Sequence, residues 1–122
     1  MKRLMTIAMM LAGGLLFAQE VRTETYENGQ TKTQYTVYGN YIEMIAFYQD
    51  GQVKETGSYL ANKPHGEYRQ YNEAGDLISA GEYVNGEKEG IWLYRAGGGD
   101  MLYQIEYVDN VRTTVNRWVA VE

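Results

Sequence analysis

Aromatic residues and glycines recur along this chain at one constant spacing, every twenty-four positions, with polar and turn-forming residues between them. The aromatic positions at this spacing are Tyr35, Tyr59, Tyr83 and Tyr107, and the glycines are Gly51, Gly75 and Gly99. Three further columns keep the same step, namely Gly57 with Gly81, Gly66 with Gly90, and Tyr68 with Trp92. Agreement of several columns at one period indicates an internal structural repeat.

Each repeat has the same order of local signals. A short strand ends in an Asn-containing turn, a glycine follows, an aromatic strand comes next, and a second turn leads into the following unit. The dipeptides at residues 28–29, 50–51 and 85–86 are Asn-Gly or Asp-Gly, which tolerate the positive φ of tight hairpin turns. The pattern predicts an all-β antiparallel meander of hairpins, with units at approximately 26–48, 49–72, 73–96 and 97–122.

The first and last units depart from the pattern, as expected of terminal repeats. Tyr35 lies six positions after the first repeat glycine, Gly29, in place of eight, so we expect a strand that is two residues shorter. Arg95 stands where the earlier units have an aromatic residue, and three glycines follow, which predicts a bulge or a looser turn. Trp118 lies eleven residues after Tyr107, and we expect residues 112–121 to form a capping strand.

The composition supports many short strands and excludes cysteine chemistry. The chain has twelve Tyr and fourteen Gly but only two Phe, one Pro and no Cys. Without Cys, the protein can have no disulfide, thiolate metal site, Cys nucleophile or lipidated Cys. Stability must therefore come from packing and from the hydrogen bonds of the sheet.

Residues 1–18 have the features of a secretory signal peptide. Lys2 and Arg3 form a positive start, residues 4–17 are apolar, and Ala18 is a small residue suited to the position before cleavage. The apolar stretch is shorter than the roughly 20 residues that span a bilayer. We expect cleavage near Ala18, a repeat domain over 19–122, and export to the periplasm or the cell surface.

Charge restricts the class of partner. The formal net charge of −5 becomes −7 once Lys2 and Arg3 are removed. Such a chain repels phosphate backbones and anionic headgroups unless its cations gather on one face. Nucleic acid is therefore excluded as the expected partner, and anionic lipid is disfavoured.

The repeat resembles the MORN repeat, and more closely the variant in bacterial YwqK-like antitoxin components. The resemblance covers roughly residues 26–110 and rests on the periodic order glycine, aromatic, turn, glycine, aromatic. It implies one β-hairpin per repeat, stacked into an elongated, twisted, single-layer sheet. The family name implies an antitoxin, and the repeat's own name, membrane occupation and recognition, implies a scaffold at a lipid surface.

Few residues are candidates for chemistry. The only His, His65, lies in a predicted turn and is expected to be solvated. Glu87 and Glu89 also lie in a predicted turn, where two solvated carboxylates are the simpler interpretation than a cation site. The glycines before Asp100 do not form a phosphate loop, because a strand and not a helix is expected after them. We predict no catalytic residue, metal or cofactor, and a hydrolase is the least favoured class.

The aromatic residues are the best candidates for binding. Tyr68, Trp92 and the four tyrosines of the repeat column are expected to be structural, because stacked aromatic side chains supply buried area in a thin sheet. The exposed strand aromatics are the candidate binding surface, and they are Tyr38, Tyr41, Tyr94 and Tyr103. The sequence thus predicts a non-enzymatic module that binds a protein or a cell-wall glycan through aromatic side chains or an open sheet edge. An antitoxin-like protein and a membrane-surface scaffold are the alternatives.

Overall fold

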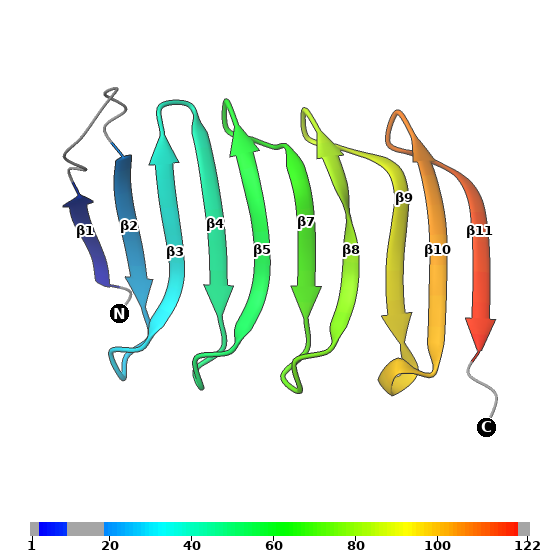
Figure 1. The fold of residues 1–122 in the computed structure, drawn as a ribbon, viewed down its shortest axis with the longest axis horizontal. Helices are drawn as coiled ribbons and strands as arrows, with labels where there is room; N and C mark the ends of the chain where they lie inside the picture. Colours follow the sequence, from blue (N-terminus) through cyan, green and yellow to red (C-terminus); the bar gives the residue numbers. More distant parts are fainter. Residues whose placement is uncertain (1–2, 10–18, 120–122) are drawn as a thin grey trace.

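The computed structural model describes residues 3–9 and 19–119, which form one antiparallel β-sheet of eleven strands (Figure 1). Ten strands follow one another across the sheet in chain order, and the two-residue strand β6 pairs with β5 beside this path. The predicted all-β meander is therefore confirmed. The elements are β1 (Arg3–Met9), β2 (Gln19–Thr25), β3 (Thr31–Tyr38), β4 (Tyr41–Phe47), β5 (Val53–Leu60), β6 (Lys63–Pro64), β7 (Gly66–Tyr71), β8 (Leu77–Val84), β9 (Glu87–Ala96), the 3₁₀ turn η1 (Gly97–Gly99), β10 (Met101–Val108) and β11 (Val111–Val119).

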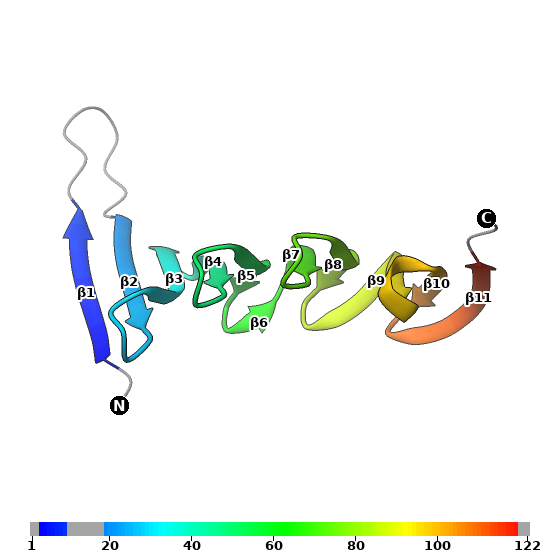
Figure 2. The same ribbon diagram turned by 90° about the horizontal axis from the view of Figure 1, so that it is seen from below.

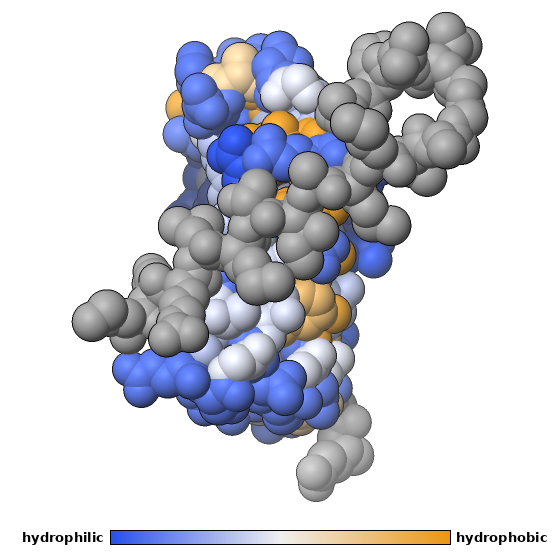
Figure 3. All heavy atoms as spheres, turned by 90° about the vertical axis from the view of Figure 1, so that its left-hand side faces the viewer, coloured by the Kyte–Doolittle hydropathy of each residue, from blue (hydrophilic) through white to orange (hydrophobic). Residues whose placement is uncertain are grey.

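The sheet is a single layer. Seen edge-on, the described strands form one elongated row with neither a second sheet nor an α-helix against them (Figure 2). Seen along the sheet from the β1 side, hydrophilic residues are the most numerous of the described residues in view, with hydrophobic ones among them (Figure 3). Because no second layer covers the described strands, side chains are buried only where they cover one another. The buried hydrophobic residues of the described chain are Met44, Trp92, Ile105 and Tyr107.

The pairing register places these buried side chains on one face. Directly paired residues of an antiparallel sheet project to the same side, and alternate residues of a strand do so as well. Met44 pairs with Gly57, and Trp92 pairs with Ile105. We call this side the aromatic face, and its side chains include Met44, Tyr59, Tyr68, Tyr83, Lys88, Trp92, Tyr94, Tyr103, Ile105 and Tyr107.

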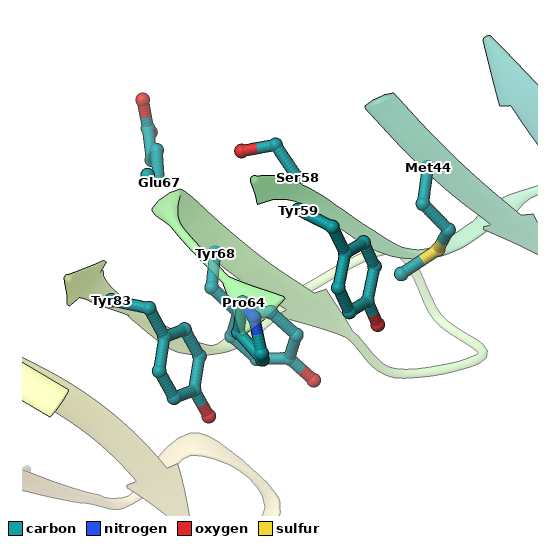
Figure 4. A pocket seen from close by; sticks show the side chains of 9 residues that line it. Met44, Ser58, Tyr59, Pro64, Glu67, Tyr68 and Tyr83 are labelled. Atoms are coloured by element: carbon teal, nitrogen blue, oxygen red, sulfur yellow. The ribbon is translucent and has the colours of Figure 1, made fainter. Parts of the chain in front are cut away.

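The two faces can be followed directly around β5 and β7. The rings of Tyr59, Tyr68 and Tyr83 extend to one side of the strands, whereas Ser58 and Glu67 point to the other (Figure 4). The three tyrosine rings of this part of the sheet therefore lie together on the aromatic face, and Ser58 and Glu67 lie on the opposite face.

Two-residue bulges account for the length of the repeat. Ala80 pairs with Leu93 but Glu82 pairs with Glu89, so β9 contains two residues more than β8 over this step. Gly90 lies in the bulge with a φ of +72°, a backbone conformation that favours glycine. The same shift occurs between β5 and the segment that contains β6 and β7, where Gly66 has a φ of +100°. The column of Gly66 and Gly90 is thus a column of bulge glycines.

The first unit lacks this bulge, and the expectation of a shorter strand is wrong. The strands β3 and β5 each contain eight residues, and β3 pairs with β4 without interruption. The first unit is two residues shorter than the later units because it lacks the two extra residues of the bulge. As a result, Tyr35 lies in the same row as Gly57, and Val37 lies in the row of Tyr59. Tyr35 is therefore not the structural equivalent of Tyr59, although it stands one full period before it.

The glycine column Gly51, Gly75 and Gly99 lies in the turns at one end of the sheet. Their φ angles are +93°, +90° and +102°. The amides of Gly51 and Gly75 donate to the carbonyls of Tyr48 and Asn72, each at 3.0 Å. At Gly99 the turn takes a different form, the 3₁₀ turn η1, which is the looser turn expected after Arg95.

At the C-terminal side of the sheet, β11 supplies the expected last strand as far as Val119, and the final predicted residues lie outside the described ones. Trp118 pairs with Leu102, which places its side chain on the face opposite to Trp92. Trp118 is 48% exposed, whereas Trp92 is 1% exposed. The face changes because β11 has one extra residue at its register shift beside Tyr107, whereas β9 has two extra residues at its bulge.

Candidate binding site

The structure divides the four candidate binding tyrosines into two pairs on opposite faces. Tyr38 and Tyr41 flank the turn between β3 and β4, and their ring centroids are 6.2 Å apart. Tyr94 and Tyr103 are direct partners across β9 and β10 on the aromatic face. Tyr94 pairs with Ser79, which lies on the aromatic face, whereas Tyr41 pairs with Leu60, which lies on the opposite face. The four tyrosines therefore do not form one surface.

Trp92 is the centre of the aromatic face. Its ring centroid lies 5.8 Å from that of Tyr68 and 6.0 Å from that of Tyr94, and both pairs are stacked. Tyr83 and Tyr107 meet the same ring edge-on, at 4.9 and 6.5 Å. Its indole Nε1 donates to the carbonyl of Glu82 at 3.1 Å, so the buried polar atom is satisfied. The structural role predicted for this column fits this packing.

Gly81 explains why Trp92 can lie so close to the sheet. A Cβ atom built on Gly81 would stand 2.0 Å from Cδ2 of Trp92, which is far inside van der Waals contact. The indole therefore lies against backbone where any other residue would have a side chain. This steric requirement applies to Gly81, whereas a Cβ atom on Gly57 would stand 3.4 Å from Cδ2 of Tyr68.

Lys88 extends into the same cluster. Its Nζ lies 5.0, 5.5 and 5.2 Å from the ring centroids of Trp92, Tyr94 and Tyr107, which is cation–π distance. The ammonium also donates a hydrogen bond of 3.0 Å to the hydroxyl of Tyr94. Three aromatic rings and one hydroxyl thus fix the position of a positive charge on the aromatic face.

A hollow of about 380 Å³ opens beside this charge. We call it the cationic pocket, and it is lined by Lys88, Tyr94, Tyr103, Ile105, Tyr107 and Arg112. Hydrogen bonding with Tyr94, together with the positive charges of Lys88 and Arg112, lowers the pKa of Tyr107. Burial, followed by hydrogen bonding with Tyr107, raises the pKa of Tyr94. The pocket combines two cations and three tyrosines, and none of its lining residues is acidic.

A second, smaller hollow lies one repeat earlier (Figure 4). It encloses about 90 Å³ and is bounded by Met44, Tyr59, Pro64, Tyr68 and Tyr83 among others. Its polar contact is the hydroxyl of Tyr68, which donates to the carboxylate of Glu55 at 2.9 Å. Burial, followed by this hydrogen bond, raises the pKa of Tyr68. This hollow has room for only a few atoms, so it is less suited to a ligand.

The other residues considered for chemistry link neighbouring turns. Nδ1 of His65 accepts a hydrogen bond of 3.2 Å from the backbone amide of Asn85. Glu89 repeats this contact at the equivalent place in the next unit, because its Oε2 accepts from the amide of Asp109 at 3.3 Å. His65 is therefore more than the solvated turn residue that we expected. Glu87 and Glu89 lie at the start of β9 and not in the turn itself.

Sequence reasoning missed the two cations of the pocket. Lys88 stands between two acidic residues, and this local pattern indicates a solvated turn. The alternation of side chains along β9 could have placed Lys88 beside Trp92 and Tyr94, since residues 88, 90, 92 and 94 share one face of the strand. Arg112 gives no such signal, because a shift of register between β10 and β11 decides that it pairs with Tyr107.

Two tyrosines that connect successive repeats were also missed. The hydroxyl of Tyr26 donates to the carbonyl of Phe47 at 2.7 Å, and that of Tyr48 donates to the carbonyl of Tyr71 at 2.7 Å. Lys32 and Lys54 lie over these two rings, at 5.5 and 5.8 Å from the centroids. The absent bulge makes the spacing of these two tyrosines two positions shorter than the repeat, so a search at the full period does not align them.

Within residues 3–9 and 19–119, no group of three acidic or imidazole side chains is placed to hold a metal ion. In the same part of the chain, no helix has the length and apolar character needed to cross a membrane. Comparison of the sequence with family models and curated proteins, and of the fold with solved structures, finds no match.

Proposed function

We propose that this chain is an exported, non-enzymatic repeat module that binds a protein or a glycan through its aromatic face. The observation that supports the proposal best is the cationic pocket, an open hollow where three tyrosines lie beside two cations in a chain of net charge −5. Concave sites with aromatic walls and a few fixed polar groups are typical of ligand binding. The resemblance to MORN-type antitoxin components is compatible with a protein partner, such as an exported toxin.

Export is the part of the proposal that the sequence supports most directly. The strand β1 lies within the predicted signal peptide, and Ala18 lies outside the described residues. N-terminal sequencing of protein recovered from the cell envelope or the medium should give a chain that starts near Gln19. Recovery of an intact chain beginning at Met1 from the cytoplasm would contradict export and the choice of extracellular partners.

Binding can be assigned to a face with one pair of variants. Tyr103→Ala removes a ring from the aromatic face, whereas Tyr38→Ala removes one from the opposite face. We would titrate the protein with peptidoglycan fragments, neutral glycans and vesicles of anionic lipid, and follow fluorescence at two salt concentrations. The proposal expects weaker binding only for Tyr103→Ala. Tight, salt-sensitive binding to the vesicles would contradict it and would favour a membrane-surface scaffold.

A further inference from the structure

We infer that the cationic pocket binds the carboxylate-bearing sugar unit of an acidic glycan. Lys88 and Arg112 bind the carboxylate, and the neighbouring tyrosine rings contact the sugar ring. This inference rests on the proposed binding function, because it names the class of ligand that one part of the aromatic face recognises.

The pocket concentrates positive charge in a negatively charged chain. The whole chain has 16 acidic residues against 11 Lys and Arg, yet the pocket is lined by one Lys, one Arg and no acidic residue. The ion pairs found among the described side chains join Arg22 with Glu20 and Arg69 with Glu67, at other places in the sheet. Neither Lys88 nor Arg112 forms an ion pair with a described carboxylate. An anionic ligand would supply the opposite charge that the pocket does not contain.

Lys88 is held in place before a ligand arrives. Its ammonium lies among the rings of Trp92, Tyr94 and Tyr107, which restricts the otherwise flexible side chain. The hydrogen bond to Tyr94 uses one of its three N–H donors. A cation that is already ordered loses less conformational entropy on binding than a free surface lysine. The arrangement therefore favours a hydrogen-bonded anion over a loosely attracted one.

The walls of the pocket favour a sugar over an acidic peptide side chain. A volume of about 380 Å³ lies at the small end of known ligand sites, which suits a ring with one charged substituent. The C–H bonds of a sugar ring meet the electron-rich face of an aromatic ring favourably. The tyrosine hydroxyls can in addition donate to, or accept from, the hydroxyls of a sugar. An aspartate or glutamate side chain offers neither the ring nor the hydroxyls.

A single carboxylate also fits the surroundings of the pocket better than a polyanion does. A long phosphate backbone would extend past the two cations over a chain whose net charge is negative, and would be repelled there. An isolated charge on a sugar unit needs only the pocket itself. A short acidic glycan, whose charge does not extend far beyond the pocket, is the ligand class that satisfies both conditions.

The test compares one acidic glycan with its uncharged form. The chain is expressed from its full coding sequence, with Trp118→Phe so that Trp92 is the only indole reporter. The probes are trigalacturonate, its methyl ester and triglutamate. We expect trigalacturonate to bind about tenfold more tightly than the ester, since a charged hydrogen bond contributes on that order.

The variants separate the pocket from general charge. Lys88→Gln and Arg112→Gln should each weaken trigalacturonate binding about tenfold. Lys54→Gln is the matched control, because it removes the same charge from a lysine that also lies over a tyrosine ring. It should leave the affinity nearly unchanged. Arg112 lies on the exposed strand β11, so Arg112→Gln decides the question if Lys88→Gln fails to fold.

Three results would overturn the inference. They are equal binding of acid and ester, equal binding of triglutamate, and normal trigalacturonate affinity in folded Arg112→Gln. Binding of neutral glycans or peptidoglycan fragments that Tyr103→Ala weakens, without any response to trigalacturonate, would overturn the acidic ligand and leave the proposed function standing. Failure of every probe would also overturn it and leave a protein as the partner to be sought.

Discussion

Two neighbouring repeats of this sheet have the same backbone arrangement but differ in how closely their side chains pack. In the unit formed by β5 and β7, Tyr68 lies over Gly57 and leaves a hollow of about 90 Å³. In the unit formed by β8 and β9, the larger ring of Trp92 lies over Gly81 and is 1% exposed. The same pairing of glycine and aromatic residue therefore gives a loosely filled site in one repeat and a closely packed one in the next.

The two units also differ at one further equivalent position. Pro64 borders the hollow of the earlier unit, and Lys88 stands one period later at the border of the cationic pocket. The repeat thus fixes where a side chain lies, and the residue type at that place decides the chemistry. A repeat protein can in this way carry one specific pocket on a scaffold whose other units serve mainly to support it.

Trp92→Ala should have the largest effect on stability. The ring contacts four tyrosines and is almost fully buried, so its removal should lower the free energy of unfolding by about 3 to 5 kcal/mol. Tyr68→Ala should cost clearly less, because its surroundings already contain a hollow. Urea denaturation of both variants tests the comparison. Equal losses would mean that the two units are packed alike.

Gly81→Ala and Gly57→Ala should change stability in opposite directions. Alanine at Gly81 overlaps the indole of Trp92, which must move, at a cost of about 3 kcal/mol. At Gly57 the new Cβ stands 3.4 Å from Cδ2 of Tyr68, an ordinary contact. Because alanine restricts the unfolded chain, Gly57→Ala should stabilise the fold by about 0.5 kcal/mol. Thermal unfolding measures both, and a loss of stability at Gly57 would refute the contrast.

This contrast also shows how far sequence reasoning reaches. The constant period correctly predicted the meander and detected the columns that contain Gly81 and Trp92, but only the structure shows that these two residues meet. The period misplaced Tyr35, since a missing bulge shifts the register without changing the local pattern. It also joined Tyr38 and Tyr94 in one surface, although they lie on opposite faces. Whether two strand residues share a face depends on every bulge between them, and bulges leave only a weak signal in sequence.

Tyr83→Ala should destabilise the protein more than His65→Ala. The ring of Tyr83 lies between the two units, 5.7 Å from that of Tyr68 and 4.9 Å from that of Trp92. Its truncation should cost about 2 kcal/mol. His65→Ala loses one exposed hydrogen bond to Asn85 and should cost about 0.5 kcal/mol. Melting temperatures measured side by side test this order, and equal shifts would count against packing of aromatics between repeats.

The smallest effect concerns pH and again separates the two units. Burial and the hydrogen bond to Glu55 raise the pKa of Tyr68, so the folded state favours its neutral form. A group with a raised pKa contributes stability below its unfolded pKa, which for tyrosine is about 10, and loses that contribution as pH rises. Stability should therefore fall above about pH 10, and Tyr68→Phe should reduce this loss. Denaturation of both proteins at pH 8 and at alkaline pH measures the difference. An equal alkaline loss in Tyr68→Phe would assign the effect to other tyrosines of the aromatic face, and would remove Tyr68 as a distinguishing feature of the earlier unit.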